Sequence, residues 1–170
     1  MELWDLYTVD RKPLGKTMVR GEPNPDGCYN LGVYIWIRNR EGKYLISQRA
    51  ADKSSYPLCW ETVGGCVLAG ETSLQGAVRE VREEVGLVIA PDQLELIFTL
   101  TDSLWHGHVL QEIDDVYLCR LETEYDESLV VSDEVIQGKW MTTAEIRQLF
   151  RENRFIDVLE PIFDKIDNVR

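Results

Sequence analysis

Residues 65–87 read GCVLAGETSLQGAVREVREEVGL, and the fold follows from this stretch more than from any other. Thr72 and Gln75 stand three residues apart in the form of a capping box, which begins a helix. Gly86 stands where a left-handed C-cap glycine ends one. Between them, five residues recur at helical spacing and form an apolar stripe: Leu74, Ala77, Val78, Val81 and Val85. The pattern predicts a helix that ends near Val85.

Three glutamates, Glu80, Glu83 and Glu84, accompany this stripe. At about 100° per residue they share one edge of the predicted helix. Like charges at these spacings repel by a few tenths of a kcal/mol per pair, unless a cation lies among them. A solvated acidic face is the alternative interpretation. Because hard oxygen ligands favour Mg²⁺ or Mn²⁺ over zinc, the cluster indicates a divalent metal site that can also hold substrate phosphates.

The spacing of the residues in this stretch indicates a family more specifically than the charge of the three glutamates does. Gly65 is followed after five residues by Glu71, and after seven more by REVREEVGL at residues 79–87. This pattern resembles the complete Nudix box of the Nudix hydrolases. The resemblance implies an α/β (α+β) fold: an α/β/α sandwich with a central mixed β-sheet, to which this chain adds an N-terminal β-hairpin. We expect a single domain over residues 1–170, with the hairpin and a loop in 1–28 and the box in 65–87.

The same resemblance implies a reaction and a cofactor. Nudix hydrolases use Mg²⁺, or Mn²⁺ in its place, to cleave a phosphoanhydride bond in a nucleoside diphosphate derivative or a related small molecule by attack of water on phosphorus. Glu80, Glu83 and Glu84 match the ligand and base positions, and the carbonyl of Gly65 matches a backbone ligand. Which glutamate accepts the proton stays open.

The resemblance also implies supporting residues. Arg79 and Glu71 match residues of the catalytic set that orient the loop and the helix. Some members supply a further acid from the loop before a late strand, where Glu134 is our candidate metal ligand. Asp114 and Asp115 are its rivals, unless they only interrupt an edge strand.

Three residues near the box are candidates for substrate binding. Arg49 follows a predicted strand and is a candidate phosphate contact, unless it is a solvated strand end. Trp60, with Tyr56, is a candidate for stacking on a base, although aromatic residues beside a sheet often belong to the core. Gly64 borders the box and completes this set. His106 and His108 form a pair whose role stays open between surface groups and substrate contacts.

Predicted strands and helices surround the box. Alternating or β-rich runs occur at residues 3–9, 14–19, 31–38, 44–48, 60–63, 94–100, 109–121 and 136–141. The first and second runs are expected to form one hairpin, and the third and fourth runs a second one. The run that begins at Trp60 is expected to end at Gly64. The 109–121 run is expected to break near Asp114. Further helices are expected from Thr142 and over 155–166, where Pro161 marks a kink or a first turn.

Composition limits the partners. A net charge of −12 repels nucleic acid, so we expect a small diphosphate substrate and no nucleic acid polymer. The apolar runs are far shorter than the roughly 20 residues that span a bilayer, and the first residues do not resemble a secretory signal. We therefore expect a cytoplasmic protein without a membrane partner, with four free cysteines and a possible homodimer.

Two alternatives accompany the hydrolase interpretation. The N-terminal part of the chain also resembles isopentenyl diphosphate isomerase-like Nudix proteins. Where that isomerase has its catalytic cysteine this chain has Gly64, and where it has a metal-binding histidine this chain has Cys66. Both differences argue against isomerisation. The second alternative is a catalytically inactive nucleotide-binding module, which the intact carboxylates disfavour.

Overall fold

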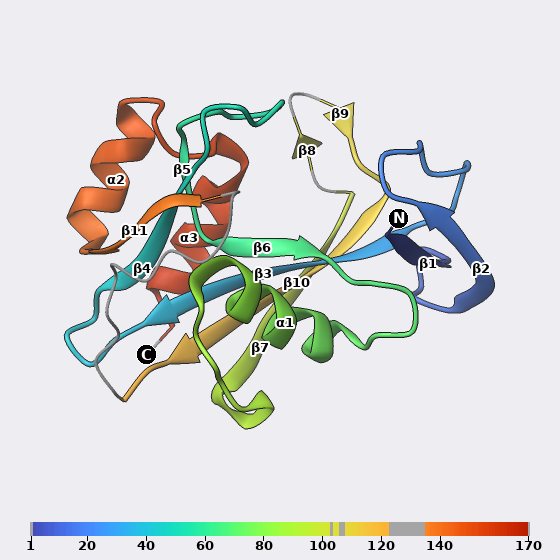
Figure 1. Ribbon diagram of the computed structural model, residues 1–170, viewed down its shortest axis with the longest axis horizontal. Coiled ribbons are helices and arrows are strands. Elements are labelled where there is room, and N and C mark those ends of the chain that lie inside the picture. The colour runs from blue at the N-terminus through green and yellow to red at the C-terminus, as the bar shows by residue number, and fades with distance from the viewer. Residues whose placement is uncertain (1, 103, 106–107, 123–134, 170) are drawn as a thin grey trace.

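A mixed β-sheet between two layers of helix forms the body of the molecule (Figure 1). The computed structural model describes residues 2–102, 104–105, 108–122 and 135–169. The sheet runs in the order β11-β4-β3-β10-β7, with β5 beside β4 and β6 beside β3. Only the pairing of β3 with β10 is parallel among the described strands of this sheet. The strands are β3 (Asn30–Arg38), β4 (Tyr44–Arg49), β5 (Trp60–Glu61), β6 (Val63–Cys66), β7 (Leu94–Thr101), β10 (Glu112–Arg120) and β11 (Val135–Met141).

The two faces of the sheet carry separate hydrophobic cores. Successive side chains of β3 point to opposite faces, so Val33 and Ile35 pack against α1 (Ser73–Val85), whereas Trp36 packs against the other layer. That layer consists of α2 (Thr143–Arg151) and α3 (Glu160–Asp167). Because both faces are covered, β3 is apolar nearly throughout. The expected α/β/α sandwich with a central mixed sheet is confirmed.

The helix of the box forms as its sequence predicts. Thr72 caps α1 and exchanges both hydrogen bonds of the capping box with Gln75, and Gly86 ends the helix with a φ of 70°. Ala77, Val81 and Val85 are buried, and Leu74 and Val78 are partly buried beside them. The remaining edge of α1 is left for charged residues.

The N-terminal hairpin consists of β1 (Leu3–Tyr7) and β2 (Pro13–Val19), as expected. It is held to the body at several points. The amides of Ala69 and Gly70 donate to the carbonyl of Leu3 at 2.8 Å and to Asp5 Oδ2 at 2.7 Å. The hairpin is therefore fastened to the loop that precedes α1.

Two strand predictions near the box need correction. The 60–63 run does not end at Gly64: it is interrupted at Thr62, whose hydroxyl donates to the carbonyl of Ile35, and β6 then carries Gly64 and Gly65 inside the sheet. The 109–121 run is not broken near Asp114 but at residues 110–111, between β9 (His108–Val109), which pairs with β8 (Leu104–Trp105), and β10.

The C-terminal segment also differs from the continuous helix expected over 155–166. Phe155 forms a bridge with Trp60, a 3₁₀ turn, η2, follows at Asp157–Leu159, and Pro161 lies in the first turn of α3. A second 3₁₀ turn, η1, at Pro91–Gln93 precedes β7. No helix in the described part of the chain is long and apolar enough to span a bilayer.

Candidate active site

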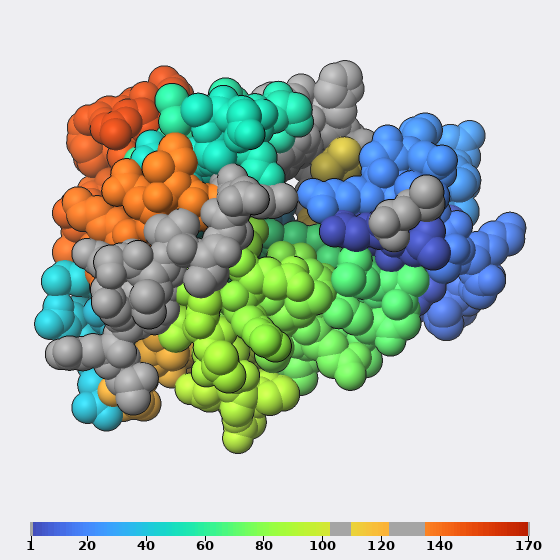
Figure 2. All heavy atoms as spheres, viewed as in Figure 1, coloured from blue at the N-terminus to red at the C-terminus, as the bar shows by residue number. Residues whose placement is uncertain are grey.

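A hollow of about 660 Å³ opens where β3 changes its neighbour. Along one edge, β3 pairs first with β6, at Gly32–Ile35, and then with β4, at Ile37 and Arg38. The hollow lies across β6 and is bordered by the end of β4, by α1, by β10 and by the hairpin. Figure 2 shows the side on which the hairpin (blue), residues 50–60 (turquoise) and α1 (green) approach one another.

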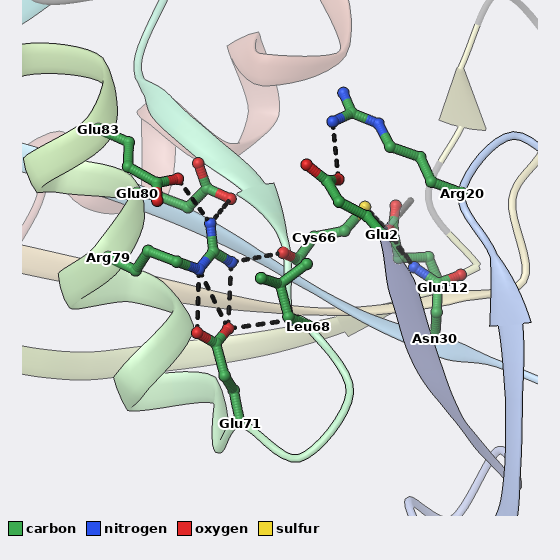
Figure 3. Close-up of polar contacts among 10 residues, drawn as sticks. All are labelled: Glu2, Arg20, Asn30, Cys66, Leu68, Glu71, Arg79, Glu80, Glu83 and Glu112. Carbon is green, nitrogen blue, oxygen red and sulfur yellow. Dashed lines mark hydrogen bonds and ion pairs between the residues drawn. The ribbon is translucent and has the colours of Figure 1, made fainter.

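Arg79 is the centre of an ion-pair network on the α1 side of the hollow (Figure 3). Its guanidinium donates to Glu71 at 3.0 Å, to Glu80 at 2.8 Å and to Glu83 at 3.0 Å. A further hydrogen bond of 2.9 Å reaches the carbonyl of Cys66. The Arg79 guanidinium thereby joins the end of β6 to three carboxylates of the box.

Glu71 fixes the loop in turn. Its Oε2 accepts from the amide of Leu68 at 3.0 Å while the same carboxylate binds Arg79. The resemblance predicts that Arg79 and Glu71 orient the loop and the helix, and their hydrogen bonds connect these two segments.

Glu80 lies over the backbone of Gly65. A Cβ placed on Gly65 would stand 2.5 Å from Cδ of Glu80, closer than real Cβ contacts allow. Glycine at this position therefore leaves the space that the carboxylate occupies. The structure brings Gly65, Glu80, Glu83 and Glu84 to the same hollow.

The charges of the cluster differ in exposure. The side chain of Glu80 is 13% exposed and that of Glu83 59%. Oε2 of Glu84 is buried although the residue borders the hollow. The cluster therefore presents both buried and solvent-exposed carboxylate oxygens to the hollow, and such oxygens can bind a cation there.

The donor set fits a hard divalent cation. Carboxylate oxygens and a backbone carbonyl are the ligands that Mg²⁺ prefers. Within the residues that the structure describes, no three acids, histidines or cysteines already converge on one point, because Arg79 lies among Glu71, Glu80 and Glu83. Gly65, Glu80, Glu83 and Glu84 nevertheless border one open hollow, which a cation can enter.

Two of the three predicted substrate contacts border the hollow, and the third does not. Arg49 and Gly64 border the hollow, and Arg49 forms an ion pair with Glu61 at 2.9 Å. Trp60 does not: it is 6% exposed and packs in the core beside α2 and α3. The expectation that Trp60 stacks on a base is therefore corrected, since its bridge to Phe155 draws it into the second core.

The remaining candidates are partly outside the described residues. Glu134 and His106 lie outside them, as does the side chain of His108. Asp114 and Asp115 do not interrupt an edge strand, because β10 lies between β3 and β7. Asp114 borders the hollow, whereas Asp115 points to the other face and forms an ion pair with Arg11.

The sequence analysis did not identify Glu112 of β10 as part of the hollow. Glu112 accepts hydrogen bonds from Asn30 at 2.7 Å and from the thiol of Cys66 at 3.4 Å (Figure 3). Burial raises the pKa of Glu112, and burial and this carboxylate raise the pKa of the Cys66 thiol well above its ordinary value. The period of two in a strand puts Glu112 and Asp114 on one face, which is the signal that could have paired them.

The hairpin supplies a second missed group. Glu2, Trp4, Arg20 and Gly21 border the hollow, although they lie more than 40 residues before the box. Arg20 forms an ion pair with Glu2 at 2.8 Å near Cys66 in the view of Figure 3. No spacing rule connects these residues to the box, because only the tertiary fold brings them there.

Comparisons with known proteins find similar proteins over most of the chain. The NUDIX domain family profile matches residues 29–159. The Nudix hydrolase lmo0368 of Listeria monocytogenes is 32% identical over 157 residues, which cover 92% of this chain and 89% of that protein. The isopentenyl-diphosphate Delta-isomerase of Shigella flexneri is 27% identical over 145 residues, 83% of this chain and 77% of that protein.

Solved structures share the fold. The crystal structure of DR0079 from Deinococcus radiodurans superposes with a TM-score of 0.71 at 22% identity and covers 91% of both chains. At this identity the likeness concerns the fold alone. The matched family region begins at Tyr29, so the hairpin that borders the hollow precedes it.

Proposed function

The chain belongs to the NUDIX family, and on that premise we propose that it is a Mg²⁺-dependent hydrolase of the phosphoanhydride bond in a nucleoside diphosphate derivative or related small molecule. The observation that carries the proposal is the position of Glu80 over Gly65, beside Glu83 and Glu84 and held by Arg79. This arrangement puts several carboxylates and a backbone carbonyl at the edge of a hollow large enough for a small substrate.

The metal would be held by Glu80, Glu83, Glu84 and the carbonyl of Gly65, with Mn²⁺ able to replace Mg²⁺. When bound, such an ion supplies positive charge to the phosphate oxygens and lowers the pKa of a water molecule. The donor chemistry of the residues present fits that ion, because carboxylate oxygens and the backbone of Gly65 border one hollow. Glu134 stays a proposed additional ligand.

The other residues of the site have separate proposed roles. Glu71 and Arg79 orient the loop and the carboxylates, because their hydrogen bonds join Leu68, Cys66 and Glu80. One glutamate of the cluster accepts the proton of the attacking water. Arg49, which borders the hollow and pairs with Glu61, is proposed to contact phosphate oxygens, and Gly64 to contact the substrate from β6.

Isomerisation is the second candidate function, since the isomerase of Shigella flexneri is similar over most of both chains. Its catalytic cysteine position is occupied here by Gly64, which carries no group that can donate or accept a proton. The histidine position is occupied by Cys66, whose thiol donates to Glu112. These substitutions favour hydrolysis over isomerisation.

A diphosphate panel in ¹⁸O-water tests the proposal. We expect hydrolysis that requires added Mg²⁺ or Mn²⁺, with the label in a phosphate product, because water attacks phosphorus. Glu84→Gln is the matched inactive variant, and Arg82→Gln, exposed on the same helix, is the control. Undiminished turnover in excess chelator contradicts the metal dependence. Conversion of isopentenyl diphosphate to its allylic isomer without label would reverse the ranking of the two enzymes.

A further inference from the structure

The hairpin forms a wall of the hollow and is fastened to the loop between β6 and α1. Trp4 and Arg20 border the hollow from β1 and from the residue after β2. The carbonyl of Leu3 and the carboxylate of Asp5, on either side of Trp4, accept hydrogen bonds from Ala69 and Gly70 of the loop between β6 and α1. Trp4 is thereby held at a fixed place relative to Glu80 and Gly65.

Trp4 differs from the tryptophans of the core. Its indole N–H is buried and reaches no acceptor among the described residues, a property it shares with Trp36 and Trp60. Trp36 and Trp60, however, are packed in the second core, whereas Trp4 is half-buried and borders the hollow. Neither the aromatic pairs nor the cation–π contacts found among the described residues include Trp4.

The rest of the hollow has mixed polarity. Glu112 and Asp114 border it across β6, and Val33, Leu110, Ile156 and Leu159 add apolar side chains. A planar heteroaromatic ring can stack on an indole with one face and donate to carboxylates with its edge.

We propose that Trp4 is a substrate-contacting residue that determines specificity: its indole stacks on the planar base of the substrate while the diphosphate lies at the box. The inference rests on the proposed function and deepens it, since it assigns the hairpin, which precedes the matched family region, to recognition of the base.

Binding measurements test Trp4 apart from turnover. Calorimetry with α,β-methylene nucleoside diphosphates and with the base-free methylenediphosphonate, both with Mg²⁺, compares the wild type with three variants. Trp4→Leu keeps an apolar side chain in the wall without a ring, and Trp4→Phe keeps a ring. Leu3→Ala is the matched control, because Leu3 is the neighbouring residue of β1, is 41% exposed and lies outside the lining of the hollow.

We expect Trp4→Leu to weaken the nucleoside probe by about tenfold or more, the scale of base–aromatic stacking, and to leave the base-free probe within about threefold. Trp4→Phe and Leu3→Ala should retain nearly wild-type affinity for both. Equal losses for the two probes, or no loss for the nucleoside probe, overturn the inference.

The two proposals fail in different ways. A wild-type enzyme that hydrolyses methyl diphosphate but does not bind the nucleoside probe overturns the role of Trp4 and leaves the hydrolase proposal intact. A wild-type protein that binds the nucleoside probe through Trp4 but hydrolyses no diphosphate overturns the hydrolase proposal and supports the role of Trp4.

Discussion

Glu80 of α1 occupies the space that a side chain at Gly65 of β6 would fill: a Cβ there would stand 2.5 Å from Cδ of Glu80. The two residues are 15 positions apart, and the glycine has no need of positive φ for its conformation. Its absent side chain is what permits the carboxylate to lie against the strand. A change at either residue is therefore expected to affect the site before it affects the fold.

Gly65→Ala tests this relationship. Glu80 must leave its place and lose its hydrogen bond from Arg79, so we expect hydrolysis to fall by about tenfold or more. The melting temperature should change little, because the obstructing atoms are the end of a flexible side chain. Gly64→Ala is the contrasting variant: its Cβ would meet the carbonyl of Val33 at 2.8 Å, which should destabilise the fold by about 1–3 kcal/mol. Full activity in Gly65→Ala would refute the interpretation.

Arg79→Gln should lower both stability and activity. The side chain of Arg79 is 19% exposed and forms ion pairs with three carboxylates, so its loss should cost about 2–3 kcal/mol in the free energy of unfolding. Added Mg²⁺ should recover part of this loss in urea denaturation, because a cation among the acids restores the balance of charge. Arg82 is exposed and follows Arg79 by three residues on α1, and Arg82→Gln should change the free energy of unfolding by no more than about 0.5 kcal/mol. Equal effects of the two substitutions would exclude a special role for Arg79.

Glu84→Gln separates a catalytic carboxylate from a structural one. It removes one charge from the site without changing the shape of the side chain, so activity should fall by about a hundredfold or more. The melting temperature without metal should stay the same or rise slightly, since repulsion from Glu80 is relieved. The increase in melting temperature on adding Mg²⁺ should shrink. Glu160→Gln, exposed at the start of α3, serves as the control. A lower melting temperature with near-normal turnover would argue for a structural role.

Arg11→Gln should make the stability less dependent on pH in acid. Burial opposes ionisation of Asp115, but hydrogen bonds from Arg11, Ser73 and Thr99 outweigh it and lower its pKa below the ordinary 3.8. A lowered pKa in the folded state stabilises the protein above the unfolded pKa, and this contribution is lost as the pH falls through the folded value. The half-exposed Arg11 should therefore contribute about 1–2 kcal/mol at pH 7.

Urea denaturation at pH 7, 5 and 3 measures that contribution. The difference between wild type and Arg11→Gln should be nearly constant from pH 7 to 5 and smaller at pH 3. Arg40→Gln breaks an ion pair whose two side chains are each 70% exposed, and should show no comparable difference at any pH. A difference for Arg11→Gln that grows toward low pH would contradict the lowered pKa of Asp115.

Local features of the chain were readable because their interactions are local. The capping box of Thr72 and Gln75, the C-cap at Gly86 and the shared edge of Glu80 and Glu84 depend on residues within about four positions of one another, whose geometry a helix fixes. The hairpins followed from alternation and turn residues for the same reason. The family and the carboxylate cluster were therefore evident without coordinates.

Contacts between distant segments were not readable in this way. Trp4 and Trp60 have the same side chain but different surroundings. The bridge to Phe155 holds Trp60 in the core, whereas the hydrogen bond from Ala69 to Leu3 holds Trp4 beside the hollow. Asp114 and Asp115 are adjacent, yet the pleat of a central strand sends one to the hollow and the other to Arg11. Spacing fixes neighbours along a helix, whereas pairing across a sheet is fixed by register and topology, and these exist only in the assembled fold.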